Sequence, residues 1–233
     1  MLLSAATSFA QEEVPEETTN PPLVRVELRQ DILAPYKERR DNHGLYLAFD
    51  YEVLNLKNYV STLDGLSYGE MFGESEIPLL RASIDYKYNM SLGSLAVGLD
   101  YAQGELSQQV SGVDRTLSVT RYGVGLKYVA DMIADEPYVA PYIGINFWQM
   151  DLSETSPTDS FSGTTQIGYN YTLGLMVQLN WLDPATAQGG AFAWGLENTF
   201  LDLYITQYAQ TSDSTDPNTE TDLLYGAGLR LEF

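Results

Sequence analysis

Apolar and polar residues alternate along most of this chain, and the alternation is clearest at its carboxyl end. Residues 221–233 read TDLLYGAGLRLEF. One face of this segment is apolar and ends in Phe233, whereas the other holds Gly226, Gly228 and Arg230. Successive side chains of a β-strand point to opposite faces. The pattern therefore predicts a strand with two unlike faces, one of them suited to an apolar environment such as lipid.

The same period of two recurs from residue 43 to residue 204. With the terminal segment it predicts eight strands, at about residues 43–57, 78–90, 95–101, 115–129, 138–150, 166–181, 190–204 and 221–233. In the seventh, the alternation changes phase near Phe200 and Leu201, which a β-bulge would explain. The connections at 91–94, 130–137 and 182–189 are short, and those at 58–77, 104–114, 151–165 and 206–220 are longer. This parity is typical of bacterial outer-membrane barrels.

A soluble eight-stranded barrel is the competing interpretation, and the polar face of the strands decides against it. In a soluble barrel the polar face points to water, where long Lys and Glu side chains have room. Here that face is crowded with Gly, Ala, Ser, Thr and Asn, which suit a narrow interior. The sequence therefore predicts an all-β, antiparallel, up-and-down transmembrane barrel with short periplasmic turns and longer extracellular loops.

Alternation also assigns charged residues to the barrel interior. They comprise six acids and five bases: Asp50, Glu52, Arg81, Asp85, Lys87, Asp100, Arg121, Lys127, Glu197, Arg230 and Glu232. Buried charges are stable only when paired, so this near balance predicts an ion-pair network that closes the lumen. The alternative is a narrow polar path that passes small ions or solutes when the network rearranges.

Loop parity sorts the outward aromatic residues into two rims. Those expected on the periplasmic side are Tyr88, Tyr128, Trp181, Phe192, Trp194 and Phe233, and those expected near the other rim are Tyr51, Tyr101, Phe147, Tyr169 and Tyr225. Tyr and Trp concentrate at the two membrane–water interfaces. Two aromatic girdles are therefore predicted.

The first 42 residues precede the predicted barrel, and within them only Val24, Val26 and Leu28 alternate with charged residues, as in a short strand or an extended arm. Residues 1–10 are apolar and end in small residues around Phe9, which predicts the back part of a secretory signal peptide without its basic start. Residues 11–22 are acidic and rich in Thr and Pro, as in a disordered linker. Residues 23–42 are expected to form a periplasmic arm, and residues 43–233 the barrel.

The arm ends in a basic cluster of Lys37, Arg39 and Arg40. Three roles remain open for it. It could contact the phosphates of the inner leaflet, fold under the barrel mouth as a partial plug, or remain a solvated collar.

The net charge of -20 resides mainly in the expected outer loops. Against the single base Arg115 they hold Asp64, Glu70, Glu74, Glu76, Glu105, Asp114, Asp151, Glu154, Asp159, Asp213, Asp216 and Glu220. An acidic crown of this kind argues against nucleic acid as a partner. It could bind Ca²⁺ or Mg²⁺ weakly, with Glu70, Glu74 and Glu76 as the cluster, bind a basic partner, or serve only as a solvated surface.

Catalytic chemistry is scarce in this sequence. There is no cysteine and one histidine, His43, at the start of the first strand. Small outer-membrane enzymes need a base such as His near the outer rim, and parity places His43 on the opposite side. We therefore expect no enzyme activity, no cofactor and no metal site built from His or Cys.

Residues 43–233 resemble the small outer-membrane β-barrel families of the OmpA, OmpX and OmpW type. The resemblance rests on the terminal YGAGLRLEF, on PYIGINFW at 141–148 and on the loop parity. It implies a location in the outer membrane, among its lipids and lipopolysaccharide. The residues that the assembly machinery would then recognise during insertion are Tyr225, Leu229, Leu231 and Phe233.

Members of these families include anchors, adhesins and narrow channels, and the fold does not select among them. We therefore expect a structural or surface-interaction role, with a possible protein partner at the extracellular loops. The alternative is a narrow porin-like channel.

Overall fold

Nine strands and three helices are formed by residues 34–110, 112–213 and 215–233, which are the residues that the computed structural model describes. The strands are β1 (His43–Leu54), β2 (Ile77–Met90), β3 (Gly93–Val110), β4 (Val113–Val129), β5 (Val139–Thr155), β6 (Ser160–Thr164), β7 (Gly168–Gln178), β8 (Asn198–Tyr208) and β9 (Leu224–Glu232). The helices are α1 (Tyr36–Arg39), α2 (Tyr68–Phe72) and α3 (Pro184–Trp194). The predicted signal peptide, the linker and residues 23–33 of the arm lie outside the described residues.

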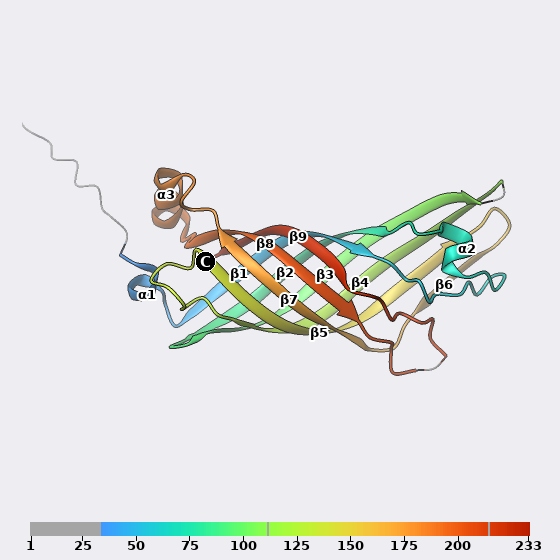
Figure 1. The fold of residues 1–233 in the computed structure, drawn as a ribbon, viewed down its shortest axis with the longest axis horizontal. Coiled ribbons are helices and arrows are strands. Elements are labelled where there is room, and N and C mark those ends of the chain that lie inside the picture. The colour runs from blue at the N-terminus through green and yellow to red at the C-terminus, as the bar shows by residue number, and fades with distance from the viewer. Residues whose placement is uncertain (1–33, 111, 214) are drawn as a thin grey trace, which may run out of the picture. The chain divides into compact units, whose positions relative to one another are not determined.

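The strands form a closed antiparallel ring (Figure 1). Neighbours in sequence pair with each other, except that β6 and β7 both pair with β5, and β1 pairs with β9 to complete the circle. At the junction, the Phe233 N–H donates to the Leu45 carbonyl at 2.9 Å, and the Leu45 N–H donates back at 2.7 Å. A closed ring satisfies every strand within the barrel wall, as lipid requires.

β6 and β7 follow one another along β5 and together act as one barrel strand. The barrel therefore has eight strands, and the predicted fold class is confirmed. The two segments are separated by a bulge, because residues 165–167 lie opposite only residues 149 and 150. The bulge predicted near Phe200 was wrong, since β8 alternates regularly through that residue.

A helix replaces part of the predicted seventh strand. The prediction of a short turn at 182–189 followed by a strand from 190 was wrong, because Pro184–Trp194 form α3. The side chain of Asp183 caps the helix by accepting from the Thr186 N–H at 3.1 Å, and Gly195, at φ 68°, ends it. Asp before Pro and a closing Gly are ordinary helix signals. The apparent phase change arose from reading helix and strand as one element.

The strands at one end are longer than predicted. We call the end where β1 begins and β9 ends the terminal end, and the opposite one the distal end. β3 and β4 pair as far as Val110 and Val113, and β5 and β6 as far as Thr155 and Ser160. Much of the predicted loops 104–114 and 151–165 is therefore strand. β2 accompanies β3 only to Gly104, so the ends of β3 to β6 form a four-stranded distal sheet beyond the ring (Figure 1).

Candidate functional site: the barrel interior and its two ends

Glu52 of β1 lies at the centre of the polar interior and is fully buried. Its carboxylate accepts from Arg121 of β4 at 2.9 Å and from the Tyr204 hydroxyl of β8 at 3.0 Å. The hydroxyl of Tyr208 also donates to it, and Arg81 of β2 lies 3.7 Å away. One carboxylate thus joins four strands across the lumen. Alternation predicts Glu52 inside, but it does not predict these partners.

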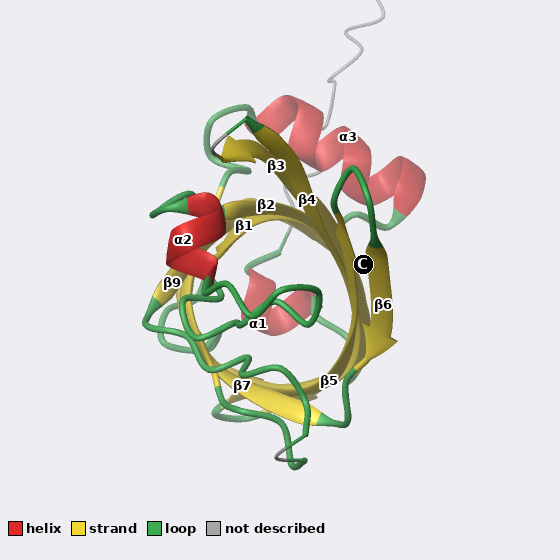
Figure 2. Cartoon of the chain, turned by 90° about the vertical axis from the view of Figure 1, so that its right-hand side faces the viewer, coloured by secondary structure: helices red, strands yellow, loops and turns green. Residues whose placement is uncertain are grey.

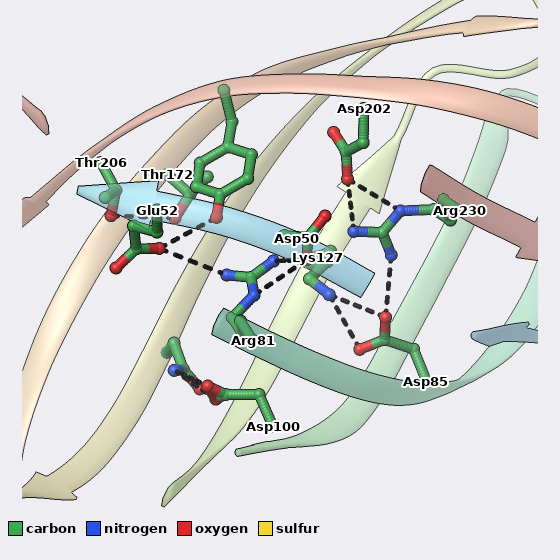
Figure 3. A network of polar contacts seen from close by, with 12 residues as sticks. Asp50, Glu52, Arg81, Asp85, Asp100, Lys127, Thr172, Asp202, Thr206 and Arg230 are labelled. Carbon is green, nitrogen blue, oxygen red and sulfur yellow. Dashed lines mark hydrogen bonds and ion pairs between the residues drawn. The ribbon is translucent and has the colours of Figure 1, made fainter. Parts of the chain in front are cut away.

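A second centre lies towards the terminal end, around Arg230 of β9. Its guanidinium donates to Asp202 of β8 at 3.0 and 2.6 Å and to Asp85 of β2 at 2.9 Å (Figure 3). Asp85 also accepts from Lys127 of β4 at 2.7 Å, and the Tyr142 hydroxyl of β5 donates to Asp202 at 2.9 Å. Charge-assisted contacts of this kind are stronger than neutral hydrogen bonds. They connect both sides of the ring.

Two further pairs extend the centre around Glu52. Arg81 donates to Asp50 of β1 at 3.0 Å, and Arg121 donates to Asp100 of β3 at 3.1 Å. Asp100 also accepts from the side-chain amide of Asn146 at 2.7 Å. The middle of the lumen is therefore crossed by paired charges, as Figure 3 shows.

The small residues of the inner face make room for large side chains from neighbouring strands. A Cβ atom at Gly174 would overlap the ring of Tyr142, and one at Gly226 would overlap the ring of Tyr204. A cavity of about 20 Å³ remains beside Lys127 and Asn146, with room for roughly one water. The glycines thus leave space for the rings of neighbouring strands in the interior.

At the terminal end the described part of the arm covers the opening. Tyr36 of α1 is fully buried, and its hydroxyl donates to Glu232 at 2.5 Å and accepts from Lys87 at 2.6 Å. Burial raises the pKa of the Tyr36 phenol far above its usual range, so it remains a donor. Figure 2, viewed from the distal end, shows α1 inside the outline of the ring.

The basic cluster of the arm is held by acids at the terminal rim. Arg40 pairs with Asp131 at 3.2 Å, and Asp131 also pairs with Lys87 at 2.7 Å. Arg39 pairs with Glu197 and, at 3.7 Å, with Glu136. Of the three roles left open for the arm, the geometry of residues 34–42 corresponds to the partial plug.

The distal opening is covered by the connection between β1 and β2. Residues 55–76 carry α2, whose Tyr68, Met71 and Phe72 are buried in an apolar cluster with Trp148 and residues of the surrounding strands. The buried apolar area stabilises this covering segment, called the lid below.

A buried polar cluster joins the lid to the distal sheet. Glu154 of β5 accepts from Arg115 of β4 at 2.9 Å, from Tyr59 at 2.9 Å and from Ser61 at 2.8 Å. Arg115 also pairs with Asp64. Glu154 and Arg115 were predicted to lie in the exposed acidic crown. That prediction was wrong, because strand pairing extends to Thr155 and turns both side chains inward.

The remaining predicted residues fall into three groups. Glu197 lies at the terminal rim, paired with Arg39 rather than with the central network. The girdle residues Tyr51, Tyr88, Tyr101, Phe147, Tyr169 and Trp181 are exposed, Tyr128 is half-buried, and Trp194 lies on α3 instead of a strand. Among the proposed assembly residues on and beside β9, Tyr225 and Leu229 are exposed, while Leu231 and Phe233 are half-buried.

The acidic triplet of the lid is not arranged for a cation. Among the described residues, no group of three or more His, Cys, Asp or Glu side chains is placed to hold a metal ion. The carboxylate of Glu70 accepts from the backbone N–H of Ser67 at 2.8 Å, and the Ser67 hydroxyl oxygen accepts from the Glu70 N–H at 3.4 Å, which forms the capping box of α2. Glu74 and Glu76 are exposed.

The outer wall of the barrel is apolar. Along β2 the inward residues are buried, whereas Leu80, Ile84 and Tyr86 are exposed. Phe49, Leu99, Val124, Ile143 and Leu173 continue this surface around the ring. An apolar outer band around a charged interior has a stable environment in a bilayer and none in water. The protein is a transmembrane β-barrel. None of the helices in the described ranges is long and apolar enough to span a membrane.

No protein-family model matches this chain, and no curated protein matches it. Its structure is similar to three solved structures. They are Ail, the attachment invasion locus protein of Yersinia pestis (12% identity, TM-score 0.45, covering 83% of this chain and 100% of that one), Neisserial surface protein A (14%, 0.44, 83% and 98%), and the N-terminal β-barrel domain of Pseudomonas aeruginosa OprF (13%, 0.43, 83% and 98%).

Proposed function

We propose that this protein is a closed structural barrel that holds an acidic sheet above the outer membrane for contact with a partner. The closed state is supported by contacts that cover the lumen at three levels. Tyr36 covers the terminal end, the Arg81–Arg121–Arg230 network fills the middle, and the lid covers the distal end.

A conducting state would have to separate these pairs. Removing the partner of a buried charge costs about 3–5 kcal/mol. Arg230 alone faces two carboxylates, Asp85 and Asp202, and is 1% exposed. The narrow channel is therefore the weaker candidate, and no contact in the interior favours it.

The distal sheet is the surface proposed for interaction. Glu105, Asp114 and Asp159 are exposed on or beside it. In the described part of the chain, β6 pairs only with β5, so its other edge is open. Open edges and carboxylates suit an extended basic segment of a partner protein.

No catalytic residue is proposed. His43 is exposed at the terminal rim, where its Nδ1 lies 2.6 Å from the Tyr86 hydroxyl and its ring lies beside those of Tyr86 and Tyr88. These contacts give it a role in the aromatic rim.

Planar-bilayer recording tests the closed barrel. Purified protein refolded in detergent should insert without steady unitary currents, and a general porin added to the same membrane supplies the positive control. Well-defined openings that scale with the amount of pure protein would overturn the closed state and support the channel. Insertion is checked separately by the shift in gel migration between unboiled and boiled samples.

A further inference from the structure

α3 is a helix with no buried residue. Its 11 residues carry no charged side chain, and none follows until Glu197. Helices this short are marginal in water, and Gly189 and Gly190 weaken this one further, by about 1 kcal/mol each relative to alanine. Neither core packing nor intrinsic propensity accounts for this helix.

α3 is apolar nearly all round, including its most exposed side. Ala185, Gly189, Phe192 and Ala193 are exposed on one side at helical spacing, beside the exposed Thr186, whereas the position of the polar Gln188 is half-covered. Phe192 is 64% exposed and Trp194 82%. Helices at the surface of soluble proteins show the opposite arrangement.

The position of α3 explains this inversion. Figure 2, which looks along the barrel, shows α3 lengthwise and outside the ring, and Figure 1 places it at the terminal end. The helix therefore runs across the barrel axis instead of along it. It lies where lipid surrounds the barrel rather than under the opening.

The apolar surface of α3 is continuous with the lipid-facing wall. Trp181 and Leu182 lead from β7 into the helix and are 57% and 62% exposed. Two of the three tryptophans of the chain thus flank this one segment. Tryptophan is the residue that anchors proteins at the headgroup level.

We propose that α3 is an interfacial helix embedded in the periplasmic, phospholipid leaflet of the outer membrane. Its Ala185–Ala193 face lies in the acyl region, and Trp181 and Trp194 lie at the headgroups. Such helices bury their apolar face about 5–10 Å into the boundary between headgroups and acyl chains. The proposal rests on the outer-membrane placement and on the terminal end being periplasmic, and it assigns the helix a role in fixing the depth of the barrel.

Spin labels test the proposal directly, because the chain has no native cysteine. Ala193→Cys carries the probe on α3. Val97→Cys on the barrel wall is the lipid control, and Asp159→Cys in a distal loop is the aqueous control. In phospholipid vesicles, the label at 193 should collide frequently with oxygen and rarely with a water-soluble nickel chelate, as the label at 97 does.

The outcomes separate the helix from the barrel. A label at 193 that behaves like the one at 159, while the one at 97 stays in lipid, overturns the inference and leaves the membrane placement intact. Exposure of 97 to nickel would contradict both. If the label at 193 is shielded from nickel but shows dipolar broadening that disappears on dilution with unlabelled protein, then a second copy of the chain covers the helix instead of lipid. With lipid as the occupant, Phe192→Ser with Trp194→Ser should restore nickel access at 193 but not at 97.

Discussion

Arg230 separates two acids that would otherwise repel each other inside the barrel. Its guanidinium bridges Asp85 and Asp202, which belong to strands β2 and β8 on either side of the β1–β9 pair. Alternation places an inward residue, but the fork geometry of arginine decides which two carboxylates it can join. Asp202 was missed from the sequence because the false continuation of β8 into α3 obscured its phase. Asp131 was missed because it lies in a turn, where alternation predicts nothing.

Replacing Arg230 with alanine should destabilise the barrel by about 3–5 kcal/mol, since two buried carboxylates lose their partner. Urea unfolding of protein refolded in vesicles measures the change. Lys57→Ala is the matched control, because its ion pair with Asp222 is exposed and should contribute no more than about 1 kcal/mol. Equal effects of the two changes would contradict the structural role of the network.

At the scale of elements, three short segments cover or extend the ring, and none of them has a regular sequence period. α1, the lid and α3 are each too short or too irregular to show a strand or helix period. α1 is fixed by Tyr36 and its charged neighbours, the lid by its apolar cluster, and α3 by capping at its two ends. Each of these segments makes its contacts at only one end of the barrel.

Tyr36→Ala should release the arm from the terminal opening, because the bonds to Glu232 and Lys87 disappear together. The expected result is faster proteolysis between the arm and β1 in refolded protein. Lys37→Ala removes a partly exposed pair with Asp135 and should leave the cleavage rate near that of the unchanged protein. Unaltered protection in the Tyr36 variant would mean that this residue does not hold the plug.

The lid should loosen in acid. Hydrogen bonds from the Ser67 N–H and hydroxyl lower the pKa of Glu70 below its ordinary value of 4.5. A lowered folded-state pKa means that the stabilisation is complete above 4.5 and is lost as pH falls through the folded value. Amide exchange in α2 should therefore accelerate below about pH 4.5 beyond the intrinsic pH dependence of exchange. Glu70→Ala should remove this acid-dependent step, and Glu74→Ala, at an exposed neighbour outside the capping box, should retain it.

At the scale of the whole molecule, the barrel is a bilayer-spanning wall with a short segment packed at each end and a projecting sheet. The apolar band fixes where lipid begins and ends. Beyond Tyr101 on β3 the outward positions become Gln103 and Glu105, although strand pairing continues. The outward residues therefore mark where the apolar band ends, although the strands continue beyond that point.

A lysine in the middle of this band should be costly and one beyond it should not. Val97→Lys is expected to destabilise the refolded barrel by about 2–4 kcal/mol, and Gln103→Lys by about 0–1 kcal/mol. Unfolding in phospholipid vesicles compares the two variants. Similar changes in the free energy of unfolding for both variants would mean that the apolar band lies elsewhere on the barrel.

The sequence by itself determined the strand number, the two faces of each strand and most of the interior charges, because a period of two is a local property. Only the tertiary structure decided which charges pair, that Tyr36 and the lid cover the two openings, and that α3 lies outside the ring. Those features depend on the register between strands and on contacts such as Tyr36 with Glu232, which are 196 residues apart. Local alternation fixes the direction of a side chain, whereas its partner is fixed only when the ring closes.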